Sequence, residues 1–327
     1  MGIFGKKVKS DKANRKRILF ATDFHGSEYT FAKLIKVLDL WSPDVLILGG
    51  DVAGKGLLPV LVDGDRARMR WMGEEHDVPL AEIEQYEDRA NQLGFYPYRA
   101  DAAGLARLKE DEDFKDRVFE DLMMERWSEW LERLEARCAE LEIPAYVIAG
   151  NDDPWALDEL NEVERQWVKG ADGKVLPLLD QWSLLSIGLA NETPWQCPRD
   201  VSEERLTEEL EALAEQVDDF RTVIANIHVP PYGSSLDIAP ELDTSVVPPR
   251  PITGSTVPVG STASRDFLEK YQPLLSLHGH IHESPGKADI GQTYALNPGS
   301  EFAEGILRAV LVTVEPGRVV GHQFVSG

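Results

Sequence analysis

The side chains of this sequence that are best suited to chemistry are carboxylates, amides and imidazoles that follow short apolar segments. Asp23 and His25 are two residues apart, so on an extended segment both side chains point to the same side. Asp51 and Asn151 each follow a glycine that ends an apolar run. A carboxylate can bridge two cations with its two oxygens, and an amide oxygen is a neutral, hard ligand. These residue types favour the binding of cations.

Three imidazoles occur within five residues, at His278, His280 and His282. Packing alone does not explain such a cluster, and imidazole is the commonest neutral metal ligand. A structural zinc site is the main alternative, but it would favour nearby cysteines, and neither cysteine of the chain is close in sequence. His228 follows another apolar run.

Taken together, these residues are too many for one small cation, whereas two cations about 3.5–4 Å apart would use them all. A mixed set of carboxylate, amide and imidazole suits manganese, iron, zinc or nickel, and we favour manganese. We interpret His76 and His322 as structural. The predicted metal ligands are Asp23, His25, Asp51, Asn151, His228, His280 and His282.

The elements that must position these ligands are short strands that alternate with helices. Strands are expected at 17–22, 44–49, 145–150, 222–227 and 274–277, and helices at 28–41 and 202–219. This alternation predicts an α/β fold, in which ligands gather beyond the carboxyl ends of the strands. Three further strands, at 292–296, 306–314 and 318–325, are expected to close the domain as an antiparallel meander.

We predict a basic, flexible tail over 1–16 and one domain over 17–327, which an insertion over 55–142 interrupts. The insertion begins with a hairpin of 58–62 and 67–72 and is helical from about 80 to 141. An apolar stripe in 114–141 either packs on the body or belongs to a cap or dimerisation arm. The Pro- and Gly-rich segment 229–264 is expected to be a long loop, either a substrate-binding lid or a disordered segment.

Composition limits the partners. The chain has 327 residues and a formal net charge of −23, so long nucleic acid is a disfavoured partner. The two cysteines show no redox or zinc-binding spacing, which favours a reducing, cytoplasmic compartment. No apolar run is long enough to span a membrane.

The motifs D-x-H (Asp23, His25), GD (Asp51), GN (Asn151), H (His228) and GHxH (His280, His282) occur in an order that resembles the calcineurin-like metallophosphoesterase superfamily. The segment 297–300, NPGS, resembles a turn of that family. The resemblance covers the chain outside the tail and the insertion. It implies a β-sandwich flanked by α-helices, in four layers α/β/β/α, with the metals at one rim and a largely helical insertion.

The resemblance also implies how the ligands are shared. One metal would be held by Asp23, His25, Asp51 and His282, and the other by Asp51, Asn151, His228 and His280. A hydroxide bridging the two metals would attack phosphorus in line.

Asn151, Asp152 and His278 are the candidate catalytic residues beside the metals, with His278 either supporting a ligand or contacting phosphate. Many family members have a histidine where this chain has Asp152, and that histidine helps to bind phosphate and to protonate the leaving group. The general acid is therefore not assigned. We predict a phosphohydrolase of small phosphoesters and favour a phosphodiesterase, because a diester or anhydride has the better leaving group.

Two alternatives belong to other classes. One is a scaffold that kept the fold, lost catalysis and binds a protein partner through its insertion, and the other is a nuclease of short oligonucleotides. The full ligand set argues against the first, and the negative charge argues against long substrates for the second. The insertion 55–142 is also a candidate surface for forming a homo-oligomer.

Overall fold

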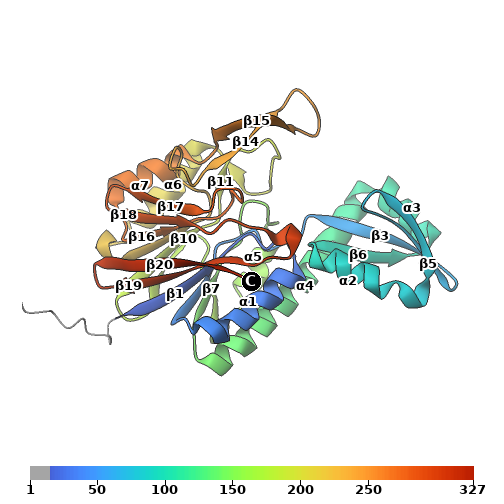
Figure 1. Ribbon diagram of the computed structural model, residues 1–327, viewed down its shortest axis with the longest axis horizontal. Helices are drawn as coiled ribbons and strands as arrows, with labels where there is room; N and C mark the ends of the chain where they lie inside the picture. The colour runs from blue at the N-terminus through green and yellow to red at the C-terminus, as the bar shows by residue number, and fades with distance from the viewer. Residues whose placement is uncertain (1–14) are drawn as a thin grey trace, which may run out of the picture.

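The computed structural model describes residues 15–327, and at its centre two six-stranded sheets pack face to face (Figure 1). The order of the first sheet is β20 (Arg318–Ser326), β19 (Arg308–Glu315), β1 (Lys16–Ala21), β2 (Val45–Leu48), β7 (Ala145–Val147) and β8 (Val168–Gly170). The order of the second is β17 (Gly286–Ile290), β18 (Thr293–Asn297), β16 (Leu275–Leu277), β13 (Val223–Ile227), β10 (Trp182–Ile187) and β9 (Lys174–Leu178). The five strands expected before the ligand clusters are β1, β2, β7, β13 and β16, so these predictions are confirmed.

Alternation along the strands of the first sheet builds two separate cores, one on each of its faces. In β1, Ile18 and Phe20 point into the layer between the sheets, whereas Leu19 points to the outer face. All three are fully buried, which explains why the sequence of the strand is continuously apolar.

Helices cover both outer faces of the sandwich. On the first sheet lie α1 (Glu28–Trp41) and α4 (Glu112–Leu141), and on the second lie α6 (Glu203–Ala214) and α7 (Thr262–Tyr271) (Figure 1). The side chains of Phe31 in α1 and Trp130 in α4 stack with their ring centroids 4.2 Å apart. The four-layer α/β/β/α fold expected from the resemblance is thus confirmed, and the apolar stripe of 114–141 packs on the body.

The first part of the insertion forms a lobe beside the sandwich (Figure 1). Its sheet has the order β5 (Glu74–Pro79), β4 (Arg66–Trp71), β3 (Gly56–Asp63) and β6 (Phe95–Ala100), with α2 (Glu84–Gln92) and α3 (Ala102–Glu110) beside it. The expected hairpin is β3 and β4. The expectation that 80–141 is helical was wrong over β6, a strand that lies between two helical patterns. Strand β5 was not expected either, because it is mostly polar. A small core that includes Val60, Met69 and Trp71 holds the lobe together.

Two further sequence predictions were wrong. The segment 229–264 contains an antiparallel pair, β14 (Ile238–Asp243) and β15 (Arg250–Pro258), and is not one long loop. Its strands are partly or fully exposed, so no apolar alternation marks them. The three C-terminal strands do not form one meander, because β18 pairs with β16 and β17 in the second sheet while β19 and β20 pair in the first.

The remaining elements are short: α5 (Leu157–Asn161), the parallel pair β11 (Ala190–Asn191) and β12 (Asp200–Val201), and 3₁₀ turns at Leu80–Glu82, Phe220–Thr222 and Phe302–Glu304. Within residues 15–327, no helix is both long and apolar enough to cross a membrane. The predicted tail falls almost entirely on residues 1–14, outside the described part of the chain.

Candidate metal centre

The loops after β1 and β2 run side by side and carry the first ligands. The backbone N–H of Asp23 donates to Gly50 O at 3.0 Å, and that of His25 donates to Asp51 O at 2.9 Å. Asp23, His25 and Asp51 have φ values of 56°, 43° and 52°, in the left-handed region that non-glycine residues rarely adopt. Such strain persists only where the surroundings hold it, and it is typical of functional sites.

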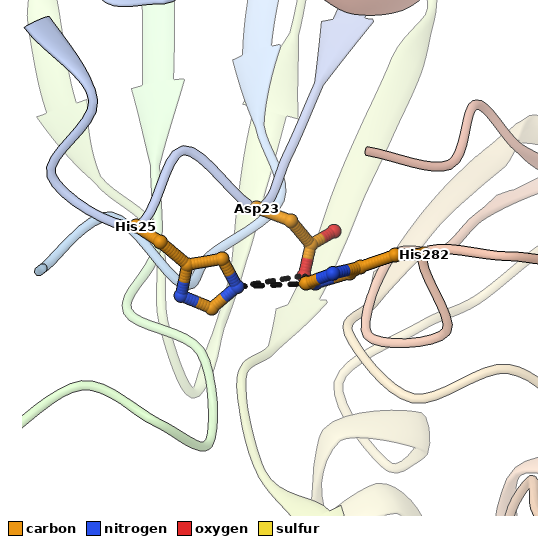
Figure 2. A group of neighbouring side chains, drawn as sticks. All are labelled: Asp23, His25 and His282. Carbon is orange, nitrogen blue, oxygen red and sulfur yellow. Dashed lines mark hydrogen bonds and ion pairs between the residues drawn. The ribbon is translucent and has the colours of Figure 1, made fainter. Parts of the chain in front are cut away.

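One group of side chains gathers Asp23, His25 and His282 (Figure 2). The Nε2 atoms of His25 and His282 lie 3.1 Å apart, and His282 Nε2 lies 3.3 Å from Asp23 Oδ1. Asp23 and His25 are buried, whereas the His282 side chain is 24% exposed. This group therefore opens to solvent on the side of His282.

A second group gathers Asp51, His228 and His280 around Asn151. The amide oxygen of Asn151 lies 3.1 Å from His228 Nε2 and 2.8 Å from His280 Nδ1. His280 also has a left-handed φ of 66°, and its backbone N–H donates to the Asp23 carboxylate. The two groups are thereby connected through the backbone of the histidine cluster.

Asp51 lies between the two groups. Its Oδ2 is 3.7 Å from His25 Nε2 in the first group and 3.4 Å from His228 Nε2 in the second. Its other oxygen, Oδ1, accepts from the backbone N–H of Asp152 at 2.9 Å. One carboxylate oxygen of Asp51 can therefore face both groups while the other oxygen is held by the loop after β7.

Burial and neighbouring charges shift the pKa values of the histidines in the centre, and the net shifts have opposite directions. Burial lowers the pKa of His25 well below its usual value, and burial together with the nearby His228 lowers that of His280 to about 3. Burial also acts to lower the pKa of His228, but the charge and hydrogen bond of Asp51 outweigh it and raise this pKa to about 10. The buried carboxylates therefore draw positive charge into the centre.

The donor set fits divalent cations. The Nε2 atoms of His25 and His282 face each other, so a proton or a cation must lie between their lone pairs. The same holds for Asn151 Oδ1 and the two ring nitrogens that face it, His228 Nε2 and His280 Nδ1. Buried carboxylates beside them would supply the compensating negative charge. Imidazole, carboxylate and amide oxygen together match borderline and hard metals.

The structure brings all seven predicted ligands to one place, at the strand ends of both sheets. Asp152 reaches the rim, where its Oδ2 lies 3.5 Å from His25 Nδ1. His278 is fully buried; its Nδ1 faces the carbonyls of Ile227 and Val229, and its Nε2 faces the Ser276 hydroxyl. Its ring atoms thus contact the strand that carries His228.

Several residues that support the ligands are not among the seven predicted ligands. Asp200 Oδ1 accepts from Asn151 Nδ2 at 2.8 Å, and the Ser300 hydroxyl donates to Asp23 O at 2.7 Å. The Asp153 carboxylate accepts from the backbone of Val52, Ala53 and Gly150 and so joins the loops after β2 and β7. Ser300 had a sequence signal in the NPGS turn, and Asp153 had one in its position two residues after Asn151, whereas Asp200 had none.

The family model for calcineurin-like phosphoesterases matches residues 111–284, and the chain belongs to this family. The matched segment contains Asn151, His228, His280 and His282, whereas the ligands from the loops after β1 and β2 precede it. The family takes its name from the hydrolysis of phosphoesters.

One curated relative and two solved structures are similar to this chain. An uncharacterized protein of Methanocaldococcus jannaschii, MJ1162, is 29% identical over 154 residues, which are 46% of this chain and 62% of that protein. The crystal structure of TT1561 of Thermus thermophilus aligns over 92% of this chain and 98% of its own, with 13% identity and a TM-score of 0.51. Another crystal structure aligns over 96% and 98%, with 17% identity and a TM-score of 0.54. These two structures share the fold.

Proposed function

We propose that the protein is a phosphodiesterase that works with two divalent cations, with manganese favoured. The observation that carries the proposal is the position of Asp51, whose Oδ2 faces an imidazole of each ligand group at 3.7 and 3.4 Å. One cation would be held by Asp23, His25, Asp51 and His282, and the other by Asp51, Asn151, His228 and His280. When bound, such a pair lowers the pKa of water and neutralises charge on phosphate oxygens.

The chain's own residues orient this centre. Asn151 would present its amide oxygen as a ligand, because Asp200 holds the amide nitrogen. Burial lowers the pKa of His278 to about 4, so its ring is neutral and its Nδ1–H can donate to a backbone carbonyl. We therefore assign His278 a positioning role for the strand that carries His228.

The choice of a diester rests on the leaving group. Asp152 stands where many family members have the histidine that protonates the leaving group, so a substrate with a better leaving group, such as a diester, is favoured. A groove of about 490 Å³ adjoins His282 and offers room for a substituent on phosphorus. Its apolar walls include Pro285, Phe302 and Phe324.

The test is hydrolysis of bis-p-nitrophenyl phosphate and p-nitrophenyl phosphate by the purified protein with Mn²⁺, Fe²⁺, Ni²⁺ or Zn²⁺. We expect turnover of the diester to exceed that of the monoester and Asp51→Asn to abolish both. Asp65→Asn, on the exposed turn between β3 and β4, serves as the matched control and should leave the rate unchanged. Absence of turnover with every metal would contradict the proposal.

A further inference from the structure

The lobe places a lysine at the rim of the metal centre. Lys55 is the residue immediately before β3, and its Nζ lies 3.0 Å from Asp152 Oδ2 and 5.9 Å from the centroid of the Phe302 ring. The same Asp152 oxygen lies 3.5 Å from His25 Nδ1. The Phe302 ring in turn lies 4.6 Å from the ring of His25. The Asp152 carboxylate therefore lies between the ammonium group of Lys55 and the predicted metal ligand His25.

The backbone around Lys55 is fixed to the rest of the site. Its N–H donates to Gly94 O at 3.2 Å, and the preceding N–H of Gly54 donates to the Tyr96 hydroxyl at 2.8 Å. A Cβ on Gly54 would lie 2.1 Å from Gly94 O, so the two segments are in close contact. The side chain is nevertheless 47% exposed, which leaves the ammonium accessible to a substrate.

The surroundings keep this lysine charged. Burial of part of the side chain opposes the charge, but the nearby carboxylates, Asp152 first and then Asp51, outweigh it and raise the pKa of Lys55 above its usual value. A lysine with a raised pKa remains an ammonium at neutral pH. It can thus donate hydrogen bonds to an anion without giving up its proton.

We propose that Lys55 is a catalytic residue that contacts a phosphoryl oxygen of the substrate, and that Asp152 is the positioning residue that holds its ammonium group over the centre. The inference rests on the proposed function. An ammonium donates to phosphate as a compact charge with three N–H groups, and the half-exposed pair with Asp152 leaves N–H groups free to do so. The proton stays on Nζ throughout, so the bond to the leaving group breaks without proton transfer from this residue.

The experiment measures binding of inorganic phosphate to the Mn²⁺-loaded protein by isothermal titration calorimetry. Lys55→Met should weaken phosphate binding about tenfold or more, because it removes a charged hydrogen-bond donor, whereas Lys55→Arg should retain most of it. Manganese content, measured by mass spectrometry, should not change in either variant, since Lys55 is not a ligand.

The control is Lys174→Met. Lys174 begins β9 in the second sheet, has a similar exposure, and pairs with Glu162 at 2.6 Å. Asp152→Asn should weaken phosphate binding less than Lys55→Met, because the ammonium remains but is no longer held. The proposal is overturned if Lys55→Met binds phosphate as tightly as the wild type, or if the loaded wild type binds no phosphate. The calorimetric experiment measures binding and does not depend on turnover. If the protein hydrolyses no diester but shows this binding pattern, the proposed function is contradicted and the role of Lys55 in phosphate binding is not.

Discussion

At the scale of single residues, the orientation of Asn151 and of His228 is set by a second residue that holds the other end of the side chain. Asn151 is the clearest case, because an amide offers either an oxygen or a nitrogen to a metal, and only the oxygen binds. Asp200 accepts from Nδ2 of Asn151, which turns Oδ1 toward His228 and His280. Other hydrogen bonds hold Asp200 itself, from the N–H and hydroxyl of Thr193 and from the N–H of Cys197.

We expect Asp200→Ala to weaken one of the two cation sites and largely spare the other. Loss of a residue that orients a ligand typically lowers metal affinity about 10–100-fold. Calorimetric titration with Mn²⁺ would show one site weakened, with Glu192→Ala, an exposed neighbour, as the control. Urea unfolding of both variants would verify that the fold is kept. Equal weakening of the two sites would contradict the role given to Asp200.

The seven candidate ligands could be predicted because each follows a strand whose apolar sequence is visible. Lys55 and Asp200 could not, because each reaches the centre through tertiary contacts that no local pattern records. The role of Asp152 could be predicted only in part. Its place beside Asn151 is evident in the sequence, whereas its pairing with Lys55 depends on how the lobe meets the sandwich.

At the scale of elements, close backbone contact joins the lobe to the loop that carries His25. Gly94, between α2 and β6, has a φ of 81°, and a Cβ there would lie 1.9 Å from His25 O. The guanidinium of Arg126 in α4 donates to Gly26 O at 2.9 Å and to Phe95 O at 3.2 Å. The lobe and the ligand loop therefore share one set of contacts, which explains how residues at the base of the lobe are placed beside the metal centre.

Gly94→Ala should destabilise the protein and disturb the ligand loop. Its left-handed φ costs about 1–2 kcal/mol for alanine, and the overlap with His25 O adds about 1–3 kcal/mol. Gly73→Ala is a matched control, because its φ is 85° but no atom lies within 4 Å of the added Cβ. Urea unfolding should show the larger loss of stability for Gly94→Ala, accompanied by weaker Mn²⁺ binding. Equal losses in both variants would show that the contact with His25 does not matter.

Some helices and strands could be predicted from the sequence and others could not. The buried strands of the sandwich are marked by continuous apolar runs, and α1 has the predicted bounds, Glu28–Trp41, with Ser27 as its N-cap. Strands β14 and β15 could not be predicted, because hydrogen bonds to Asp237 anchor both ends of their segment and little apolar surface is buried. Pairing of β18 with β16 depends on contacts between distant segments, which the strand's own sequence does not reveal.

At the scale of the whole molecule, the metal centre lies where the two sheets meet at one end of the sandwich. Asp23, Asp51 and Asn151 follow strands of the first sheet, whereas His228 and His280 follow strands of the second. The layer between the sheets is a continuous apolar core that needs no metal. Cations bound at this end would therefore link the two sheets without being required for the fold.

Adding Mn²⁺ should raise the melting temperature, and a chelator should lower it without unfolding the protein at room temperature. A cation at 100 times its dissociation constant adds about 2.7 kcal/mol per site, if it binds only the folded chain. At a few degrees per kcal/mol, this predicts a shift of about 5 °C or more. His280→Ala should reduce the shift, because it removes a ligand contributed by the second sheet, whereas Asp65→Asn should not. If neither Mn²⁺ nor the chelator changes the melting temperature, no cation links the two sheets.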